Sequence, residues 1–321
     1  MTYHDLSFLE VVCCPDSEAK LNEMEPWLYD AKECDAIYPR ICNTPILQPR
    51  VDHYLRDEIM TISRSIAEFG ENDEVKQWFF SRYGFFSHPE PLPIDSEIMG
   101  EGYPGFWENL GLPSFIRDLE LQTPEDLVLN ALGGHHPKLG LDLGAGQGGM
   151  TQQMAEICNQ VVGLERNFFL AATANRLLPA KEVVTRFFNP RKGWQNAQFE
   201  KKPVTNAYVI CGDVRQMPFC EPLFDWVHCG HVLDLVEDPA SVLQQIMRIM
   251  KPGGKLSIAT PWDFDVPGHF DQMLEMLQDY FEEIYQIDGV PYVRFNHKRR
   301  YILHEDWIWI GKLRPKQQAT G

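Results

Sequence analysis

Residues 139–151 read LGLDLGAGQGGMT, a short apolar run followed by a glycine-rich turn and then by a helical pattern. Gly144, Gly146 and Gly149 give the spacing Gly-x-Gly-x-x-Gly, which allows a chain to turn sharply from a strand into a helix. It also allows a bound ligand to come close to the backbone of the turn. The stretch therefore predicts the start of an α/β fold with a ligand-binding turn, but the glycines alone leave the ligand open.

The chain beyond this turn alternates apolar runs with helical patterns, which is typical of a parallel sheet with helices on both faces. Asp238 and Pro239 mark the beginning of one of these helices, and the Pro-Gly-Gly at 252–254 ends it. The predicted strands lie at 139–143, 161–165, 207–211, 225–229, 255–260, 283–288 and 301–313.

Charge and composition narrow the class of protein. The 321 residues carry a formal net charge of -17, from 46 acidic and 29 basic residues. A field this negative repels the phosphates of nucleic acids and anionic membrane surfaces, so we expect neither as a partner. With 44% hydrophobic residues the chain has enough apolar surface for a large core. It has no apolar run of about eighteen residues and no basic-then-apolar pattern near its start, which favours a cytoplasmic protein.

The eight cysteines, at 13, 14, 34, 42, 158, 211, 220 and 229, show no dense or regular spacing. Several of them fall inside predicted strands or helices. We therefore expect reduced thiols and no disulfide framework.

The chain before the glycine turn divides into two parts. Residues 1–50 are punctuated by proline and cysteine and form a small N-terminal α+β module. Residues 51–134 form a helical linker and cap region, in which 53–69 has apolar residues at spacings of three and four and Thr123 caps a further helix. The third part, 135–314, holds the predicted sheet.

Three carboxylates follow the predicted strands, and their positions bear on the ligand. Asp142 lies at the end of the first strand, where a negative charge suits the cationic amino group and sulfonium centre of S-adenosylmethionine better than a pyrophosphate. Glu165 lies about 20 residues beyond the turn, where either ligand would place its ribose hydroxyls. Asp213 follows the third strand, where a carboxylate can accept a hydrogen bond from an adenine amino group.

The segments LDLGAGQG, GLER, GDVRQMPF, FDWVHCGHVLDLVEDP and RIMKPGGKLSIATP, in this order and at this spacing, resemble the class I S-adenosylmethionine-dependent methyltransferases. The resemblance covers 139–310 and implies a Rossmann-like sheet of seven strands whose last strand is antiparallel. It also implies S-adenosylmethionine at the carboxyl edge. A domain that binds another adenosine compound, or a fold without activity, is the alternative. The implied cofactor-binding residues are Asp142, Gly144, Ala145, Gly146, Gln147, Glu165, Arg166, Asp213, Val214 and Cys229.

The N-terminal segments FLEVVCCPDSEAKL and CDAIYPRICNTPIL resemble the small zinc-ribbon domain that activates tRNA, ribosomal-RNA and release-factor methyltransferases. The resemblance implies a scaffold fused to the catalytic domain, and a decorative extension is the alternative. Ser17 and Ala31 stand where the family pattern has two ligands, and a structural zinc site needs about four. We therefore expect no metal. The alternative is a zinc ion bound by four cysteines: Cys13, Cys14, Cys34 and Cys42.

Methyl transfer from a sulfonium is an in-line displacement, so alignment of the acceptor carries most of the rate. His231 follows the fourth strand, and we expect it to act as a general base or to take a positioning role near the cofactor. An aromatic, glycine-rich segment at 100–111 is expected to cap the acceptor pocket or to pack as core, and 185–203 forms a lid or a surface insertion. The predicted acceptor-binding residues are Tyr103, Trp107, Trp262 and Arg294.

These features together favour a methyltransferase that acts on a small molecule. A protein or RNA methyltransferase with a built-in activator-like domain is the first alternative, and a non-catalytic binding module is the second. The acidic charge counts against RNA, and the cofactor motifs count against a mere binding module. The sequence leaves open the acceptor atom and the oligomeric state.

Overall fold

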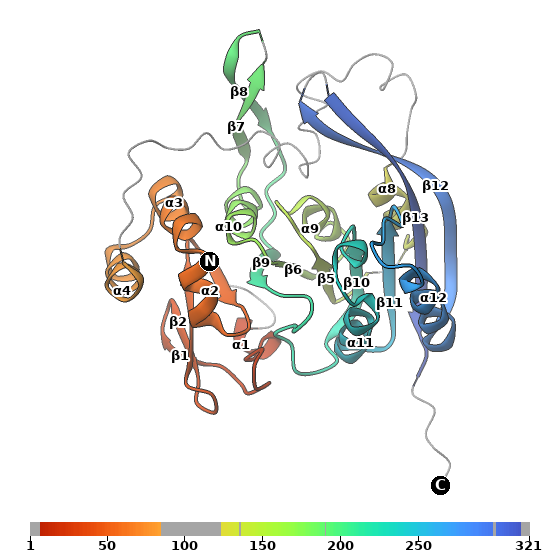
Figure 1. The fold of residues 1–321 in the computed structure, drawn as a ribbon, viewed down its shortest axis with the longest axis horizontal. Helices are drawn as coiled ribbons and strands as arrows, with labels where there is room; N and C mark the ends of the chain where they lie inside the picture. The colour runs from red at the N-terminus through yellow and green to blue at the C-terminus, as the bar shows by residue number, and fades with distance from the viewer. Residues whose placement is uncertain (1–6, 85–122, 135, 190, 298–299, 316–321) are drawn as a thin grey trace.

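The computed structural model describes residues 7–84, 123–134, 136–189, 191–297 and 300–315. A large twisted sheet with helices on both faces dominates the molecule (Figure 1). Among the described residues this sheet has eleven strands in the order β1-β2-β3-β4-β9-β6-β5-β10-β11-β13-β12, and β7 pairs with β8 alone. The Rossmann-like α/β fold is confirmed. The count of seven strands is wrong for the whole sheet, because the N-terminal module adds four more.

Seven neighbouring strands form the part of the sheet that the sequence predicts. The first five run parallel to one another, and β13 is antiparallel to both β11 and β12, as expected for the last strand. The central strands are buried on both faces, which explains their continuous apolar runs. In sheet order they are β9 (Ala207–Gly212), β6 (Gln160–Glu165), β5 (Leu139–Leu143), β10 (Phe224–Gly230), β11 (Met250–Thr260), β13 (Arg300–Leu313) and β12 (Phe281–His297).

The N-terminal module extends the other edge of this sheet. It contains α1 (Phe8–Val11), β1 (Asn22–Glu25), β2 (Leu28–Ala31), β3 (Ala36–Ile41) and β4 (Thr44–Leu47). All four residues of β4 are buried, and β4 pairs in parallel with β9 through Ile46–Cys211 and Leu47–Gly212. The module therefore covers a sheet edge that would otherwise present unpaired backbone groups to solvent.

The helices follow the predicted pattern with one difference. The pattern at 53–69 corresponds to two helices, which meet at Glu58. Thr123 caps its helix as predicted, and Asp238 accepts a hydrogen bond from the Ser241 backbone at 3.0 Å. Among the described residues, no helix has the length and apolar character that crossing a membrane requires. The helices are α2 (Val51–Asp57), α3 (Ile59–Phe69), α4 (Asp73–Tyr83), α8 (Pro124–Ala131), α9 (Gly149–Met154), α10 (Phe168–Leu177), α11 (Pro239–Ile249) and α12 (His269–Tyr280).

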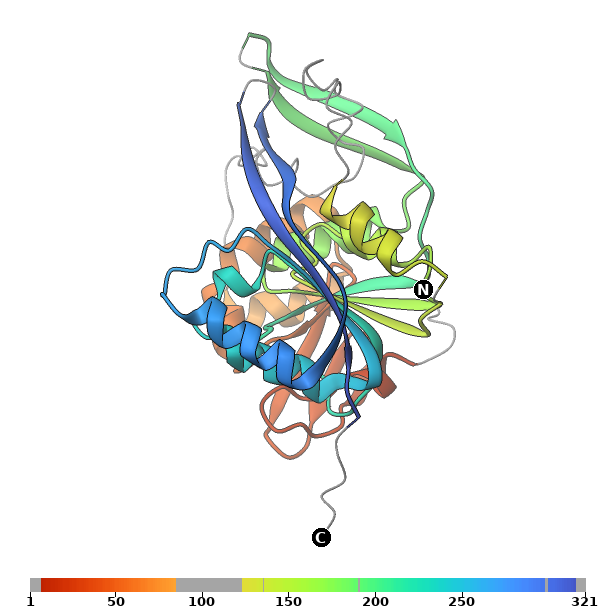
Figure 2. The same ribbon diagram turned by 90° about the vertical axis from the view of Figure 1, so that its right-hand side faces the viewer.

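Two hairpins project from the same side of the molecule (Figures 1 and 2). One consists of β7 (Glu182–Asn189) and β8 (Gly193–Glu200), which occupy the predicted insertion. The other is the outer part of β12 and β13. Because Thr260, the last residue of β11, pairs with Trp307, residues 300–306 of β13 run beyond the carboxyl end of β11.

A disulfide joins the N-terminal module to the loop after β9. Cys13 and Cys220 form this bond, with Cα atoms 6.0 Å apart, so the expectation that all cysteines are reduced is wrong for this pair. The two residues are 207 positions apart, and they meet only because the module docks against the sheet. The six remaining cysteines are free thiols: Cys14, Cys34, Cys42, Cys158, Cys211 and Cys229.

Candidate active site

The predicted cofactor residues meet at the carboxyl edge of the parallel strands. In the strand register, Asp142 lies beside Gly163 of β6 and His228 of β10. Glu165 is level with Cys211 at the end of β9. Because parallel strands end at the same edge, residues from distant parts of the chain are brought together there, in the crevice where open α/β sheets bind ligands.

The glycine turn has a backbone that only glycine adopts without strain. Gly144 and Gly146 have φ angles of 74° and 52°, in the left-handed region. A Cβ atom on Gly144 would lie 2.3 Å from Cγ2 of Val232. The turn therefore packs directly against the chain that follows β10, and this close approach brings the two halves of the edge together.

Asp142 is buried directly beneath the turn, with 2% of its surface exposed. Its Oδ2 accepts a hydrogen bond from Oγ1 of Thr151 at 2.6 Å. Burial raises the pKa of Asp142 to about 7, against the hydrogen bond from Thr151, which lowers it. A cation placed beside this carboxyl group would favour its ionised form.

Glu165 connects the end of β6 to the turn. Its Oε2 accepts from the backbone N–H of Gly146 at 2.9 Å, and its Oε1 accepts from that of Asn167 at 2.7 Å. Burial raises the pKa of this carboxyl group, while the backbone hydrogen bonds lower it. Each carboxylate oxygen has capacity for a further hydrogen bond, which is what two ribose hydroxyls require.

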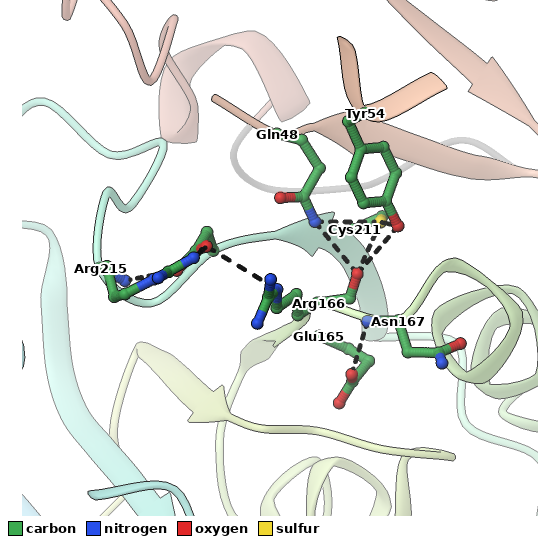
Figure 3. A network of polar contacts seen from close by, with 8 residues as sticks. Gln48, Tyr54, Glu165, Arg166, Asn167, Cys211 and Arg215 are labelled. Atoms are coloured by element: carbon green, nitrogen blue, oxygen red, sulfur yellow. Dashed lines mark hydrogen bonds and ion pairs between the residues drawn. The ribbon is translucent and has the colours of Figure 1, made fainter. Parts of the chain in front are cut away.

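Asp213, which follows β9, is paired with Arg166 and Arg215, the two arginines labelled in Figure 3. Nη2 of Arg215 lies 2.6 Å from its Oδ2, and Nε of Arg166 lies 4.0 Å from the same atom. Burial raises the pKa of Asp213, but the hydrogen bonds and charge of Arg215 outweigh it and the pKa is lowered. Asp213 is therefore an ionised acceptor. The sequence prediction included Arg166 and missed Arg215, although Arg215 lies within the quoted GDVRQMPF segment.

The remaining predicted cofactor residues line the same edge. Ala145 and Gln147 are buried within the turn, and Val214 is half-buried beside Asp213. Cys229 is buried in β10, and burial raises its pKa, so it is a neutral thiol and not a nucleophile.

Gln48 of the N-terminal module and Tyr54 of α2 contact the chain at the end of β6. Nε2 of Gln48 and the hydroxyl of Tyr54 donate hydrogen bonds to the backbone carbonyl of Arg166 at 3.1 and 2.9 Å. Both side chains also contact Sγ of Cys211, at 3.4 and 3.2 Å (Figure 3). They thereby fix the chain directly after Glu165. Sequence reasoning missed these two residues because neither lies in a recognisable motif.

A histidine–aspartate pair lies at the end of β10. Nε2 of His231 is 2.7 Å from Oδ2 of Asp306, a fully buried residue in the outer part of β13. The imidazole stacks on the ring of Tyr292 with centroids 4.6 Å apart. His231 has a φ of 53°, and its backbone N–H donates to Ala259 at 2.8 Å, which holds the residue in place. Asp306 was missed, although an acidic residue inside the apolar pattern of 301–313 is a visible signal.

Acidic groups from other elements surround this pair. Burial lowers the pKa of His231, but the hydrogen bond and charge of Asp306 outweigh it, and Glu125 and Asp234 add to the rise. Burial in turn raises the pKa values of Glu125 and Asp234. The imidazole therefore holds a proton more strongly than a histidine in water.

The predicted acceptor residues are placed only in part. Trp262 follows β11, has 41% of its surface exposed and packs its ring 4.3 Å from that of Phe270. Arg294 lies in β12, but its side chain is outside the described part of the structure. Tyr103 and Trp107 both lie outside the described residues.

Comparison with known families gives a match over the centre of the sheet. Residues 141–258 match the family model described as methyltransferase domain. This segment of the chain is therefore similar to methyltransferase domains. The edge fits S-adenosylmethionine chemically, with carboxylates for an amino cation, ribose hydroxyls and an adenine amino group.

The curated relatives of this chain match only part of it. The chain is 32% identical over 92 residues to the demethylmenaquinone methyltransferase of Lysinibacillus sphaericus, covering 28% of this chain and 38% of the relative. The Renibacterium salmoninarum protein of the same name is 26% identical over 133 residues, covering 41% and 45%. The chain thus spans less than half the length of these relatives.

The solved structures that are similar to this chain include the N-methyltransferase NodS from Bradyrhizobium japonicum WM9 in complex with S-adenosyl-L-homocysteine. Its TM-score to this chain is 0.45 at 14% identity, over 68% of this chain and 97% of that chain.

Proposed function

We propose that the protein transfers a methyl group from S-adenosylmethionine directly to a small-molecule acceptor. One observation carries this proposal: the three carboxylates at the ends of β5, β6 and β9 lie at the same sheet edge as the His231–Asp306 pair at the end of β10. The first group suits the cofactor, and the second suits an acceptor that must lose a proton.

We assign the cofactor contacts from the chemistry of each side chain. The carboxylate of Asp142 attracts the α-amino cation electrostatically. Glu165 accepts hydrogen bonds from the ribose hydroxyls. Asp213 accepts from the adenine amino group, while the glycine turn leaves room for the backbone to approach the ligand. The bound cofactor supplies an electrophilic methyl group on a sulfonium centre.

In this proposal His231 is the general base. Its Nε2 contacts Oδ2 of Asp306, which orients the imidazole. The imidazole is the group that accepts the proton at the end of β10. The neutral imidazole takes the proton from the acceptor, and the carboxylate of Asp306 stabilises the imidazolium that results. Trp262 contributes apolar surface to the acceptor pocket and excludes water there, as Tyr103 and Trp107 do in the sequence prediction. Arg294 in that prediction binds the acceptor if the acceptor is anionic.

The division of the chain into 1–50, 51–134 and 135–314 is part of the proposal. The first part acts as a built-in scaffold, since β4 pairs with β9 and Gln48 contacts the chain after Glu165. This docking of the first part against the sheet also supports a second candidate function, a protein or RNA methyltransferase with an activator-like domain. The net charge of -17 favours the small molecule over RNA.

Labelling with methyl-labelled S-adenosylmethionine tests both candidates. The protein is incubated with the labelled cofactor and a lysate fractionated into small molecules, proteins and RNA. We expect label in the small-molecule fraction, whereas label in protein or RNA would support the second candidate. Label in none of the fractions, together with calorimetry that detects NAD binding and no S-adenosylhomocysteine binding, would overturn the proposal. A Gly144→Ala variant measured in parallel identifies label that does not depend on the cofactor turn.

A further inference from the structure

Two free thiols lie in contact inside the N-terminal module and take no part in the proposed methyl transfer. Sγ of Cys14 and Sγ of Cys34 are 3.2 Å apart. A disulfide bond is about 2.05 Å long, so the two sulfur atoms need to approach by only about 1.1 Å to form one. Cys14 follows the disulfide-bonded Cys13, and Cys34 lies in the turn between β2 and β3.

The surroundings of Cys14 favour a reactive thiol. The hydroxyl of Tyr38 lies 3.1 Å from its Sγ. Burial raises the pKa of Cys14, but hydrogen bonds from Ser17, Tyr38 and Cys34 outweigh it, and the pKa is lowered. Cys158, by contrast, is a buried thiol whose pKa burial raises to about 12. The thiolate is the nucleophile in disulfide exchange, so Cys14 is favoured over Cys158.

Cys34 gives the pair access to solvent. It is half-buried and lines an open cavity of about 790 Å³ beside α2, a size at which protein cavities accept small organic ligands. Three arginines and several acidic side chains share the lining, which suits a small zwitterionic peptide. The charged lining residues are Asp16, Asp35, Arg50, Asp52, Arg56, Asp57 and Arg82.

The four cysteines of the alternative zinc site do not come together. Cys13 is bonded to Cys220, and Cys42 donates toward the carbonyl of Gly70. Within the described ranges, no group of three or more histidine, cysteine, aspartate or glutamate side chains is arranged to hold a metal ion. Of these four cysteines, Cys14 and Cys34 therefore remain as a pair of neighbouring free thiols.

We propose that Cys14 and Cys34 form a redox pair that closes reversibly into a disulfide by exchange with a small-molecule disulfide entering this cavity. The thiol of Cys34 loses its proton and attacks the small disulfide, which forms a mixed disulfide and releases one small thiol. The Cys14 thiolate then attacks Sγ of Cys34 and expels the second small thiol. Two protein thiols are oxidised and one small disulfide is reduced to two thiols, so atoms and electrons balance.

Closing the pair adds a covalent bond between two segments that non-covalent contacts connect in the present structure. It ties the turn after β2 to the segment that contains Cys14, which already contacts the loop carrying Asp213 through Gln216 and the carbonyl of Pro15 at 2.6 Å. A covalent bond would therefore do in this module what a metal ion does in a zinc ribbon, holding two loops together.

Oxidised glutathione is the probe for this proposal, applied to the full-length protein. Free thiols are blocked with a first alkylating reagent, disulfides are then reduced, and the newly released thiols receive a second reagent. Before oxidation, we expect the second label only on Cys13 and Cys220. After treatment with oxidised glutathione, we expect Cys14 and Cys34 to lose the first label and gain the second, and reduced glutathione to reverse this change. Peptide mass spectrometry assigns each site.

Two variants separate pair closure from simple exposure of a thiol. In Cys14→Ser, the mixed disulfide between Cys34 and glutathione should accumulate, because no second thiol resolves it. Cys158→Ser, at a buried thiol outside the pair, should leave the exchange unchanged. Retention of the first label on Cys14 and Cys34 in the oxidised wild-type protein would overturn the proposal, as would glutathione remaining on Cys34 with Cys14 present. The wild-type labelling decides the matter even if Cys14→Ser fails to fold.

Discussion

The carboxyl edge of the sheet carries two polar clusters that are built in different ways. The proposed cofactor cluster comprises Asp142, Glu165 and Asp213, which lie at the ends of three strands within 139–215. The acceptor cluster comprises His231 with Asp306, together with Glu125 from α8. Its members come from three separate segments, and His231 and Asp306 are 75 residues apart along the chain.

The difference lies in what holds each cluster together. Glu165 is held by the backbone N–H of Asn167, two residues later, and by that of Gly146 in the glycine turn after the neighbouring strand β5, so backbone groups close along the chain position it. His231 depends on a side chain from the outer part of β13, which reaches it only because that strand runs past the end of β11. We therefore expect substitutions in the first cluster to weaken cofactor binding, and those in the second to slow turnover.

The largest effect is expected at the acceptor cluster. General-base catalysis contributes about 10²- to 10⁴-fold, so His231→Gln should lower turnover by that factor while leaving S-adenosylhomocysteine affinity within about twofold. The measurements are turnover with the acceptor found by labelling, and calorimetry. His53→Gln is the control, because His53 also pairs with an aspartate, Asp57 at 2.8 Å, but on the surface. Equal losses of affinity and turnover would place His231 in the cofactor cluster instead.

The pH dependence sharpens the same comparison. A general base works when neutral, so kcat/KM should rise with pH as the imidazolium of His231 loses its proton. Burial lowers this pKa, but Asp306 outweighs it and raises the pKa above 6.5. Asp306→Asn should therefore move the rising limb of the profile to lower pH and reduce its plateau. An unchanged limb would show that Asp306 does not act through His231.

The next effect concerns the glycine turn. Gly144→Ala forces a left-handed alanine and a Cβ 2.3 Å from Cγ2 of Val232, so S-adenosylhomocysteine affinity should fall by about 100-fold. Calorimetry on folded protein measures this. Gly268→Ala is the matched control, since Gly268 has a φ of 92° but open space around its Cβ position. Similar affinities for the two variants would mean that contact with Val232 does not shape the cofactor site.

A smaller effect is expected at Asp142, with a distinctive signature. Its pKa of about 7 is well above the ordinary 3.8, so the carboxyl group is mostly protonated at pH 6 in the free protein. The amino cation of S-adenosylhomocysteine favours the ionised form, so binding at pH 6 should release a proton. Calorimetry in buffers of different ionisation enthalpy detects this release. Asp142→Asn should abolish it and lower the affinity about tenfold, whereas buffer-independent enthalpies for the wild type would contradict the assignment.

The smallest effect is expected from Tyr54 in α2, the helix that follows the N-terminal module. Tyr54→Phe removes one of the two hydrogen bonds to the carbonyl of Arg166, a contact of about 1 kcal/mol, so cofactor affinity should fall a few-fold with turnover unchanged at saturation. Tyr83→Phe removes a hydrogen bond of similar length, 2.7 Å to Asp52, away from the cofactor edge and serves as the control. Equal behaviour of the two variants would argue that Tyr54 stabilises the fold without affecting the cofactor site.

Local pattern was sufficient to predict the sheet that carries the cofactor cluster. The predicted strand at 139–143 coincides with β5, and Gly144 adopts the positive φ that its motif requires. The predicted helix at 53–69 is instead divided at Glu58, and β12 is much longer than 283–288. Such boundaries depend on tertiary packing, which periodicity within one segment does not reveal.

Residues that act across the fold were not predictable in the same way. Gln48 and Tyr54 belong to no motif, and the partnership of Cys13 with Cys220 spans 207 residues. Even His231, which was singled out from its place after a strand, gained its partner Asp306 only in the structure. Each of these contacts joins two segments whose spacing along the chain carries no information about their distance in space.

The sequence by itself determined the α/β class, the glycine turn and the three carboxylates at the strand ends, because strand periodicity and turn chemistry are set by residues a few positions apart. Only the tertiary structure decided that β4 would extend the sheet beside β9, and that Asp306 would meet His231. Both depend on which strand lies next to which and on how far each runs past its neighbour. Register and strand order are properties of the packed sheet, since they follow from the burial of all its faces together.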